Sequence, residues 1–342
     1  MRIAIIGATG AVGRRMVSIL EERGFPLDEL IPLASQRSAG TSVRFRGANV
    51  DVRELTSEAL VDVDLALVSA GASVSREYLP EAAAAGTVCI DNSSAFRMDA
   101  DVALSIPEVN PEALENRRSN IIAVPNCTTI TAMLPIGPLH RMAGLRSLVI
   151  SSYQSVSGAG WKGVVELEEQ VAKLHGHEEG LAHPDFGALP AGDVFGKTIA
   201  YNVIAKIASF EETGYTGEEA KMMAEPRKIL GVPDLFVAAT AVRVPTTFAH
   251  AVSLYAEFDR PITPDEAREV LRGADGVELR DDPANGVYPS PIEAAGGDDA
   301  LVGRIRQAEG RPNGLLLFSC ADNLRKGAAL NAIQIAEKVF SA

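Results

Sequence analysis

The sequence has few cysteines and no stretch suited to a membrane. Its 342 residues include only three cysteines, Cys89, Cys127 and Cys320, and no two of them form a Cys-x-x-Cys pair. Such a sparse, odd set argues against a disulfide framework and against a zinc site. No apolar stretch is long enough to span a bilayer, and the first residues lack the layout of a secretion signal. These absences predict a cytoplasmic protein that binds no metal.

Positive charge is also in short supply. Lys and Arg number 32 against 45 Asp and Glu, which gives a net charge of -13 and a pI near 5.0. This balance predicts no general surface for nucleic acid or anionic membranes, although a local basic pocket is compatible with it. The hydrophobic share of 46% is typical of a globular protein, and the length predicts two domains.

The chain begins with the pattern of a strand, a glycine turn and a helix. The apolar run 2–6 leads into Gly-Ala-Thr-Gly-Ala-Val-Gly at 7–13, and helical spacing of apolar residues follows. Glycines in this context let a backbone approach a pyrophosphate at a helix N-terminus. The spacing GxxGxxG differs from GxGxxG, and a glycine turn without a ligand is the alternative. The residues expected at the dinucleotide are Gly7, Thr9, Gly10, Ala11, Val12 and Gly13.

The second predicted strand, 30–34, ends without the acidic residue that usually holds the ribose of NAD. Ser35, Arg37 and Ser38 stand there instead. A guanidinium and two hydroxyls suit a 2′-phosphate, so this segment predicts NADP as the cofactor. A solvated loop arginine is the alternative.

Cys127 lies where an apolar run, 121–124, gives way to a helix that begins near Thr128. Backbone N–H groups converge at such a junction, and the positive end of a helix dipole lowers a thiol pKa. A nearby protonated histidine would favour the thiolate further. We therefore expect a nucleophile, with a buried core cysteine as the alternative; Cys89, inside a predicted strand, is expected in the core.

Alternating strand and helix patterns through the first third predict a parallel sheet with right-handed crossovers. The polar loop 91–97 follows one of these strands, and ligands of such sheets bind at carboxyl-end loops. Arg97 is therefore a candidate anion ligand, or else a partner in a surface salt bridge.

Beyond residue 144 the pattern changes. A strand at 145–152 ends just before Gln154, whose amide can point into a cleft, and residues 161–200 indicate a helix plus an insertion. Thr216 begins a capped helix with Glu218 and Lys221 on one face, for which exposed charges are the usual explanation.

The last third supplies two more candidate residues and a closing helix. Arg243 and His250 flank a hairpin-like turn between strands 235–244 and 249–258, and could lie close in space. The final helix, 328–340, is expected to pack back on the first domain.

Taken together, these motifs resemble the aspartate-β-semialdehyde dehydrogenase family, in order and through nearly the whole chain. The matching segments are GATGAVG at 7–13, SxRSAG at 35–40, NSSAFR at 92–97, PNCTT at 125–129, YQSVSGAG at 153–160, EExK at 218–221, RVPTTFAH at 243–250 and DNLRKGAALNAIQIAE at 322–337. The family usually has glycine where this chain has Ala249, and Ala251-Val252 also departs from its pattern; these differences bear on the placement of His250 but remove no catalytic side chain.

The resemblance implies an α/β Rossmann domain (1–126, completed by 320–342) and an α+β catalytic and dimerisation domain (127–319) of the glyceraldehyde-3-phosphate dehydrogenase type. It implies NADPH-dependent reductive dephosphorylation of aspartyl phosphate to aspartate semialdehyde, by a homodimer or a tetramer. The catalytic residues would be the nucleophile Cys127, the acid/base His250 and the orienting Gln154. Substrate would meet Arg97, Asn126, Glu218, Lys221 and Arg243, with Arg97 and Lys221 on phosphate; Ser157, Gly158 and Asn323 would join the cofactor residues.

Two alternatives stay open at this point. An N-acetyl-γ-glutamyl-phosphate reductase has the same chemistry, but its cysteine usually lies in a PGCYP-like context rather than beside Asn126 and Thr128. A non-catalytic NADP-binding paralogue would have lost the nucleophile, and Cys127 is present.

Overall fold

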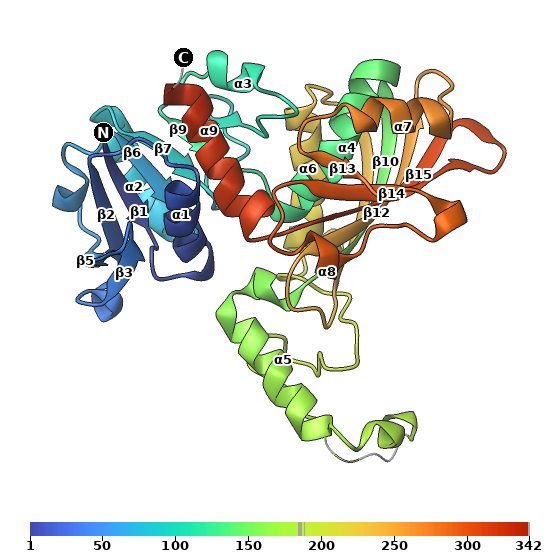
Figure 1. The fold of residues 1–342 in the computed structure, drawn as a ribbon, viewed down its shortest axis with the longest axis horizontal. Coiled ribbons are helices and arrows are strands. Elements are labelled where there is room, and N and C mark those ends of the chain that lie inside the picture. Colours follow the sequence, from blue (N-terminus) through green and yellow to red (C-terminus); the bar gives the residue numbers. More distant parts are fainter. Residues whose placement is uncertain (184–186, 188, 341–342) are drawn as a thin grey trace.

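The first of two large sheets is built from the N-terminal third of the chain. In the computed structural model, which describes residues 1–183, 187 and 189–340, all seven of its strands run parallel in the order β5-β2-β1-β6-β7-β9-β8 (Figure 1). The strands are β1 Arg2–Ile6, β2 Glu29–Ala34, β5 Arg53–Glu54, β6 Leu65–Val68, β7 Val88–Asp91, β8 Ala103–Leu104 and β9 Ile121–Ala123; a small separate ribbon pairs β3 Ser42–Phe45 with β4 Ala48–Asp51.

The central strand β6 of this sheet is apolar throughout because helices cover both faces. Every residue of β6 is buried, as expected for a strand in the middle of a parallel sheet. The flanking helices are α1 Ala11–Glu22, α2 Ala72–Ala84, α3 Glu112–Glu115 and α9 Leu330–Phe340. The expected parallel α/β domain is confirmed.

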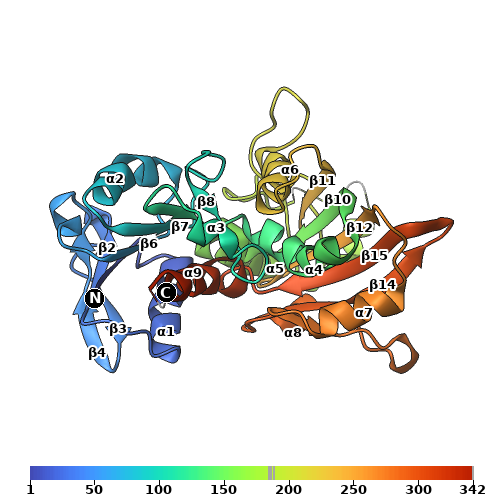
Figure 2. The same cartoon turned by 90° about the horizontal axis from the view of Figure 1, so that it is seen from above.

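Helix α9 returns from the end of the chain to pack against α1, β6 and β7, as the sequence predicts (Figures 1 and 2). It begins two residues later than predicted, because a π-turn, Arg325–Ala329, precedes it. Residues 341–342 of the predicted C-terminal segment, and residues 184–186 and 188 of the predicted insertion, lie outside the described residues.

The second sheet is mixed, with the order β11-β10-β12-β15-β14-β13. Helices α4, α6 and α7 pack against its strands, whereas α5 projects away from it (Figure 1). The strands are β10 Leu145–Gln154, β11 Phe236–Arg243, β12 His250–Phe258, β13 Val277–Leu279, β14 Ala300–Ala308 and β15 Arg311–Ala321. The helices are α4 Cys127–Ala143, α5 Trp161–Leu174, α6 Gly217–Ile229, α7 Pro264–Arg272 and α8 Pro291–Ala294.

The predicted hairpin between the strands that end at Arg243 and begin at His250 is wrong. Strand β10 lies between β11 and β12, parallel to the first and antiparallel to the second. The loop 244–249 therefore crosses the end of β10 instead of turning within one ribbon. Within the part of the chain that the structure describes, no helix has both the length and the apolar composition to cross a membrane.

Candidate active site

Cys127 is the first residue of α4, directly after the carboxyl end of β9, where the sequence places it. Asn126 caps this helix: its Oδ1 accepts the N–H groups of Thr128 at 2.9 Å and Thr129 at 3.3 Å. From the other side the C-terminal segment packs closely, since a Cβ on Gly327 would lie 2.9 Å from the Cβ of Cys127. The thiol is thus fixed at a helix start between the two sheets and remains partly exposed.

The register of the second sheet brings the other predicted catalytic groups to one edge. Gln154 at the end of β10 pairs with Arg243 at the end of β11, and Tyr153 pairs with Ala251 of β12, next to His250. The side chains of Arg243 and His250 meet around Gly158. A Cβ at that glycine would lie 2.8 Å from Nη1 of the arginine and 3.1 Å from Nε2 of the histidine.

His250 is fully buried, and a hydrogen bond determines which of its nitrogens carries the proton. The backbone N–H of Ser155 donates to Nδ1 at 3.1 Å, so the proton of the neutral ring is on Nε2. Among the described residues, that Nε2 has no hydrogen-bond partner. The imidazole therefore presents a free N–H donor to the site.

Asn323 stabilises the segments on either side of His250 by hydrogen bonds. Its Oδ1 accepts the hydroxyl of Ser155 at 3.1 Å, the hydroxyl of Ser157 at 3.2 Å and the N–H of Ala249 at 3.0 Å. Ala249 adopts φ +64°, the left-handed region in which glycine is favoured, so the departure noted in the sequence is accommodated with backbone strain. Sequence reasoning missed Ser155, although it lies within the segment YQSVSGAG at 153–160, which was the signal that could have identified it.

The expected lowering of the Cys127 pKa is wrong for the unliganded protein. Burial and, after it, the charge of Glu218 raise the pKa of the thiol to about 11, against the opposing charges of Arg97 and Arg243. Burial, followed by the nearby Arg243 charge, also lowers the pKa of His250 to about 3. His250 is therefore neutral and does not lower the pKa of the thiol, contrary to the expectation. At Cys127 itself, desolvation outweighs the effect of the helix N-terminus.

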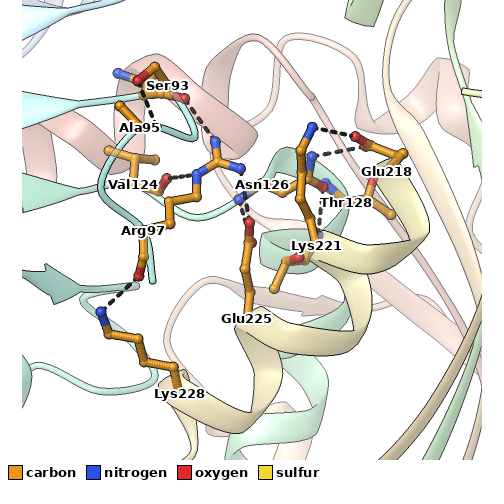
Figure 3. A network of polar contacts seen from close by, with 12 residues as sticks. Ser93, Ala95, Arg97, Val124, Asn126, Thr128, Glu218, Lys221, Glu225 and Lys228 are labelled. Atoms are coloured by element: carbon orange, nitrogen blue, oxygen red, sulfur yellow. Dashed lines mark hydrogen bonds and ion pairs between the residues drawn. The ribbon is translucent and has the colours of Figure 1, made fainter. Parts of the chain in front are cut away.

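Glu218 is buried, contrary to the exposed face that its local sequence favours. Its Oε1 accepts the amide of Asn126 at 2.9 Å, and its Oε2 accepts Lys221 Nζ at 3.2 Å (Figure 3). Its Oε1 also accepts the amide of Gln154 at 3.1 Å. Burial alone would raise the pKa of Glu218, but Lys221 and these amides lower it. The carboxylate is thus an ionised centre that joins three predicted site residues.

The three cations of the site differ in their partners. Lys221 is paired with Glu218, and Arg97 with Glu225 at 2.9 Å. Arg243 donates to the carbonyl of Ser155 at 2.7 Å, and forms no ion pair with any carboxylate that the structure describes. A buried guanidinium without a carboxylate partner is suited to bind one from a ligand.

The predicted cofactor residues fall into two groups. In the glycine turn, a Cβ on Gly7 would lie 2.4 Å from the Ser69 carbonyl oxygen, and one on Gly13 would lie 2.2 Å from the Gly7 carbonyl oxygen. The same turn contains Thr9, and α1 begins with Ala11 and Val12. Gly10 is the N-cap residue of this helix, and no described side chain accepts a hydrogen bond from the helix start. This cradle fits a pyrophosphate.

The remaining cofactor residues lie farther along the chain. Ser35, Arg37 and Ser38 follow β2 in a short helical turn, with Arg37 exposed. Ser157, Gly158 and Asn323 instead lie beside His250, where a nicotinamide ring would have to reach the reacting carbon.

Comparisons with known proteins agree over the whole length. Residues 2–117 match the family described as semialdehyde dehydrogenase, NAD binding domain, and residues 136–326 match its dimerisation domain. Aspartate-semialdehyde dehydrogenases from Corynebacterium glutamicum and Aquifex aeolicus are 48% and 46% identical, over 98% of this chain and 98% and 97% of theirs. The solved aspartate semialdehyde dehydrogenase II of Vibrio cholerae, complexed with ASA, is 43% identical with a TM-score of 0.91, over 99% of this chain and 98% of that one.

The alternatives left open by the sequence are not favoured, since these full-length relatives share one name and Cys127, the predicted nucleophile, is at the start of α4. The chain belongs to the aspartate-semialdehyde dehydrogenase family.

Proposed function

We propose that this protein reduces L-aspartyl 4-phosphate to L-aspartate 4-semialdehyde with NADPH, reversibly and through a thioester on Cys127. The observation that carries the proposal is the set of groups around that thiol. Glu218, Arg97 and Arg243 are near enough for their charges to act on it, and the Nε2–H of His250, which has no partner among the described residues, lies beside Arg243 around Gly158. These groups are suited to acyl transfer from an amino-acid derivative that carries both a carboxylate and a phosphate.

The different partners of Arg97, Lys221 and Arg243 support separate roles for them in substrate binding. Arg243, without a carboxylate of its own, binds the α-carboxylate of the substrate, and Glu218 receives the α-ammonium. Arg97 and Lys221 bind the phosphate. Asn126 lines the site, and Gln154, anchored to Glu218 at 3.1 Å, orients the acyl group.

In the reductive direction the Cys127 thiolate forms a C–S bond to the acyl carbon, and phosphate departs with the electron pair of the C–O bond. When bound, NADPH supplies the hydride that reduces the thioester. The Nε2–H of His250 shares its proton with the oxygen that becomes negative, and the proton returns to Nε2 when the C–S bond breaks to release the aldehyde and the thiolate. Every proton and electron pair is thereby returned.

NADP rather than NAD is the cofactor in this proposal, because an exposed guanidinium and two hydroxyls replace the acidic residue after β2. Arg37→Ala is expected to weaken NADPH binding about 10- to 100-fold, the contribution of a charge-assisted contact, with little effect on NADH. Fluorescence titration of both cofactors measures the difference, and equal losses for the two would contradict the assignment. Arg53→Ala, at an exposed position on neighbouring β5, is the matched control.

The proposed domain division is 1–126 with 320–342 for the nucleotide and 127–319 for catalysis; the packing of α9 on β6 and β7 supports it.

A homodimer is proposed, with a tetramer as the alternative. Apolar side chains on the second sheet support an interface there: Val149, Tyr153 and Phe236 are 37%, 40% and 61% exposed. The unpaired thiols support a reducing, cytoplasmic setting, and the product would feed lysine, threonine and methionine synthesis.

The reverse reaction gives the simplest test. Aspartate semialdehyde, NADP⁺ and inorganic phosphate are expected to yield NADPH, measured by its absorbance, and omission of phosphate should stop turnover after the acyl-enzyme forms. N-acetyl-glutamate semialdehyde is the matched control substrate. Turnover of that compound in preference to aspartate semialdehyde would overturn the proposed function.

A further inference from the structure

Glu225 is a buried carboxylate to which neither the sequence motifs nor the proposed mechanism gives a role. Only 1% of its surface is exposed, and it lies on α6 one helical turn after Lys221 and two after Glu218. Its Oε1 accepts Nη1 of Arg97 at 2.9 Å, and its Oε2 accepts the backbone N–H of Asn126 at 2.7 Å (Figure 3). One side chain thus joins the predicted phosphate ligand to the residue that caps the nucleophile helix.

The contacts of Arg97 leave part of its guanidinium free. Its Nε donates to the carbonyl of Val124 at 2.9 Å, Nη2 to the carbonyl of Asn92 at 2.8 Å, and Nη1 to Glu225. Toward the residues that the structure describes, each nitrogen therefore uses one N–H, and since a guanidinium has five, one N–H on Nη1 and one on Nη2 remain. Two such donors are what a phosphate accepts in a bidentate pair.

We propose that Glu225 is a positioning residue. It holds the plane of Arg97 against the start of α4, so that a phosphate bound to the arginine faces the acyl carbon on Cys127. The inference rests on the proposed function and adds the device that aligns its phosphate step. The alignment spans the two sheets, because Arg97 follows β7 of the first and α6 packs on β11 of the second.

Glu225→Gln tests this with little change in shape. The amide oxygen can accept only one of the two donors, and the amide NH₂ then faces the other N–H. In the oxidative direction, kcat/KM for phosphate is expected to fall about 10- to 100-fold, the effect of losing one hydrogen bond to a charged group. The burst of NADPH that accompanies thioester formation before phosphate enters should persist, because Asn126 keeps its bonds to Thr128 and Glu218.

Lys228→Met is the matched control. Lys228 lies on the same helix and donates to the backbone carbonyls of Arg97, Asp99 and Val102, but to no side chain of the site. The Lys228→Met variant should loosen the loop 97–102 that carries Arg97, while its kcat/KM for phosphate stays close to that of the wild type. Glu225→Asp, which retains the charge on a shorter arm, serves if the glutamine variant does not fold.

Three results would overturn the inference. One is an unchanged or lowered KM for phosphate in Glu225→Gln, which would mean that the carboxylate only competes for Arg97. Another is loss of the burst in parallel with phosphorolysis, and the third is an equal loss in Lys228→Met. Failure of the proposed function has a different signature, since the wild-type protein itself would then show no phosphate-dependent NADPH formation.

Discussion

Cys127→Ser is expected to reduce turnover by on the order of 10⁴-fold or more while leaving the fold and NADPH binding intact. In the proposed mechanism the thiol makes and breaks the covalent bond in both directions, whereas a serine hydroxyl at this helix start remains protonated and is a far weaker nucleophile. Steady-state kinetics measures the loss, and circular dichroism and cofactor titration verify that the variant is folded. Cys320→Ala, at a buried position on β15, should retain activity.

The pH dependence of alkylation tests the electrostatics of the same thiol. Because its pKa is raised to about 11, iodoacetamide should modify the unliganded protein faster with each unit of pH through the neutral and alkaline range. With the pKa of His250 lowered to about 3, the histidine should add no step between pH 5 and 8. Mass spectrometry locates the label; label on Cys89 or Cys320 with Cys127 unmodified and activity gone would contradict the assigned nucleophile.

His250→Asn is expected to lower kcat about 10²- to 10⁴-fold, the usual contribution of a positioned acid or base. The asparagine oxygen can still accept the N–H of Ser155 in place of Nδ1, so the variant removes Nε2 alone. KM for the semialdehyde should change little, because the charged groups of the substrate are proposed to bind to Arg243 and Glu218.

His250→Gln provides the complementary control. Its amide nitrogen can reach the position of Nε2 and donate a hydrogen bond, but it cannot transfer a proton. If the loss reflects proton transfer, both variants should be slow. Full activity in the glutamine variant would show that hydrogen bonding alone is enough, and a kcat within tenfold of wild type in both would remove His250 from the mechanism.

Sequence patterns with a local physical cause were the most informative about this fold. The capping box at Thr216 and the helix start next to Asn126 appear close to where the residues predict them, because each depends on neighbours within four positions. The predicted hairpin is wrong for the opposite reason. Two strands that follow one another in sequence need not pair, and here β10, formed some 90 residues earlier, lies between them.

The pKa shifts of the site could not be predicted from the sequence. A cysteine at a helix start predicts a reactive thiolate, but the sign of the shift depends on burial, which arises only when both sheets assemble. Glu225 was missed because glutamate in a charged helix is usually solvated. Its spacing from Glu218 and Lys221 places all three on one face, and that periodicity is the signal that could have identified it.

The return of α9 to the first sheet bears on how the protein is made. Strand β9 completes the order of the first sheet by residue 123, but Leu330, Ile333 and Ile335, fully buried against it, are synthesised roughly 200 residues later. At about 5–20 residues per second, the ribosome leaves that apolar surface uncovered for roughly 10–40 s. The nucleotide-binding half, although first to emerge, is therefore among the last parts to finish folding, and its exposed core is a natural site for chaperones.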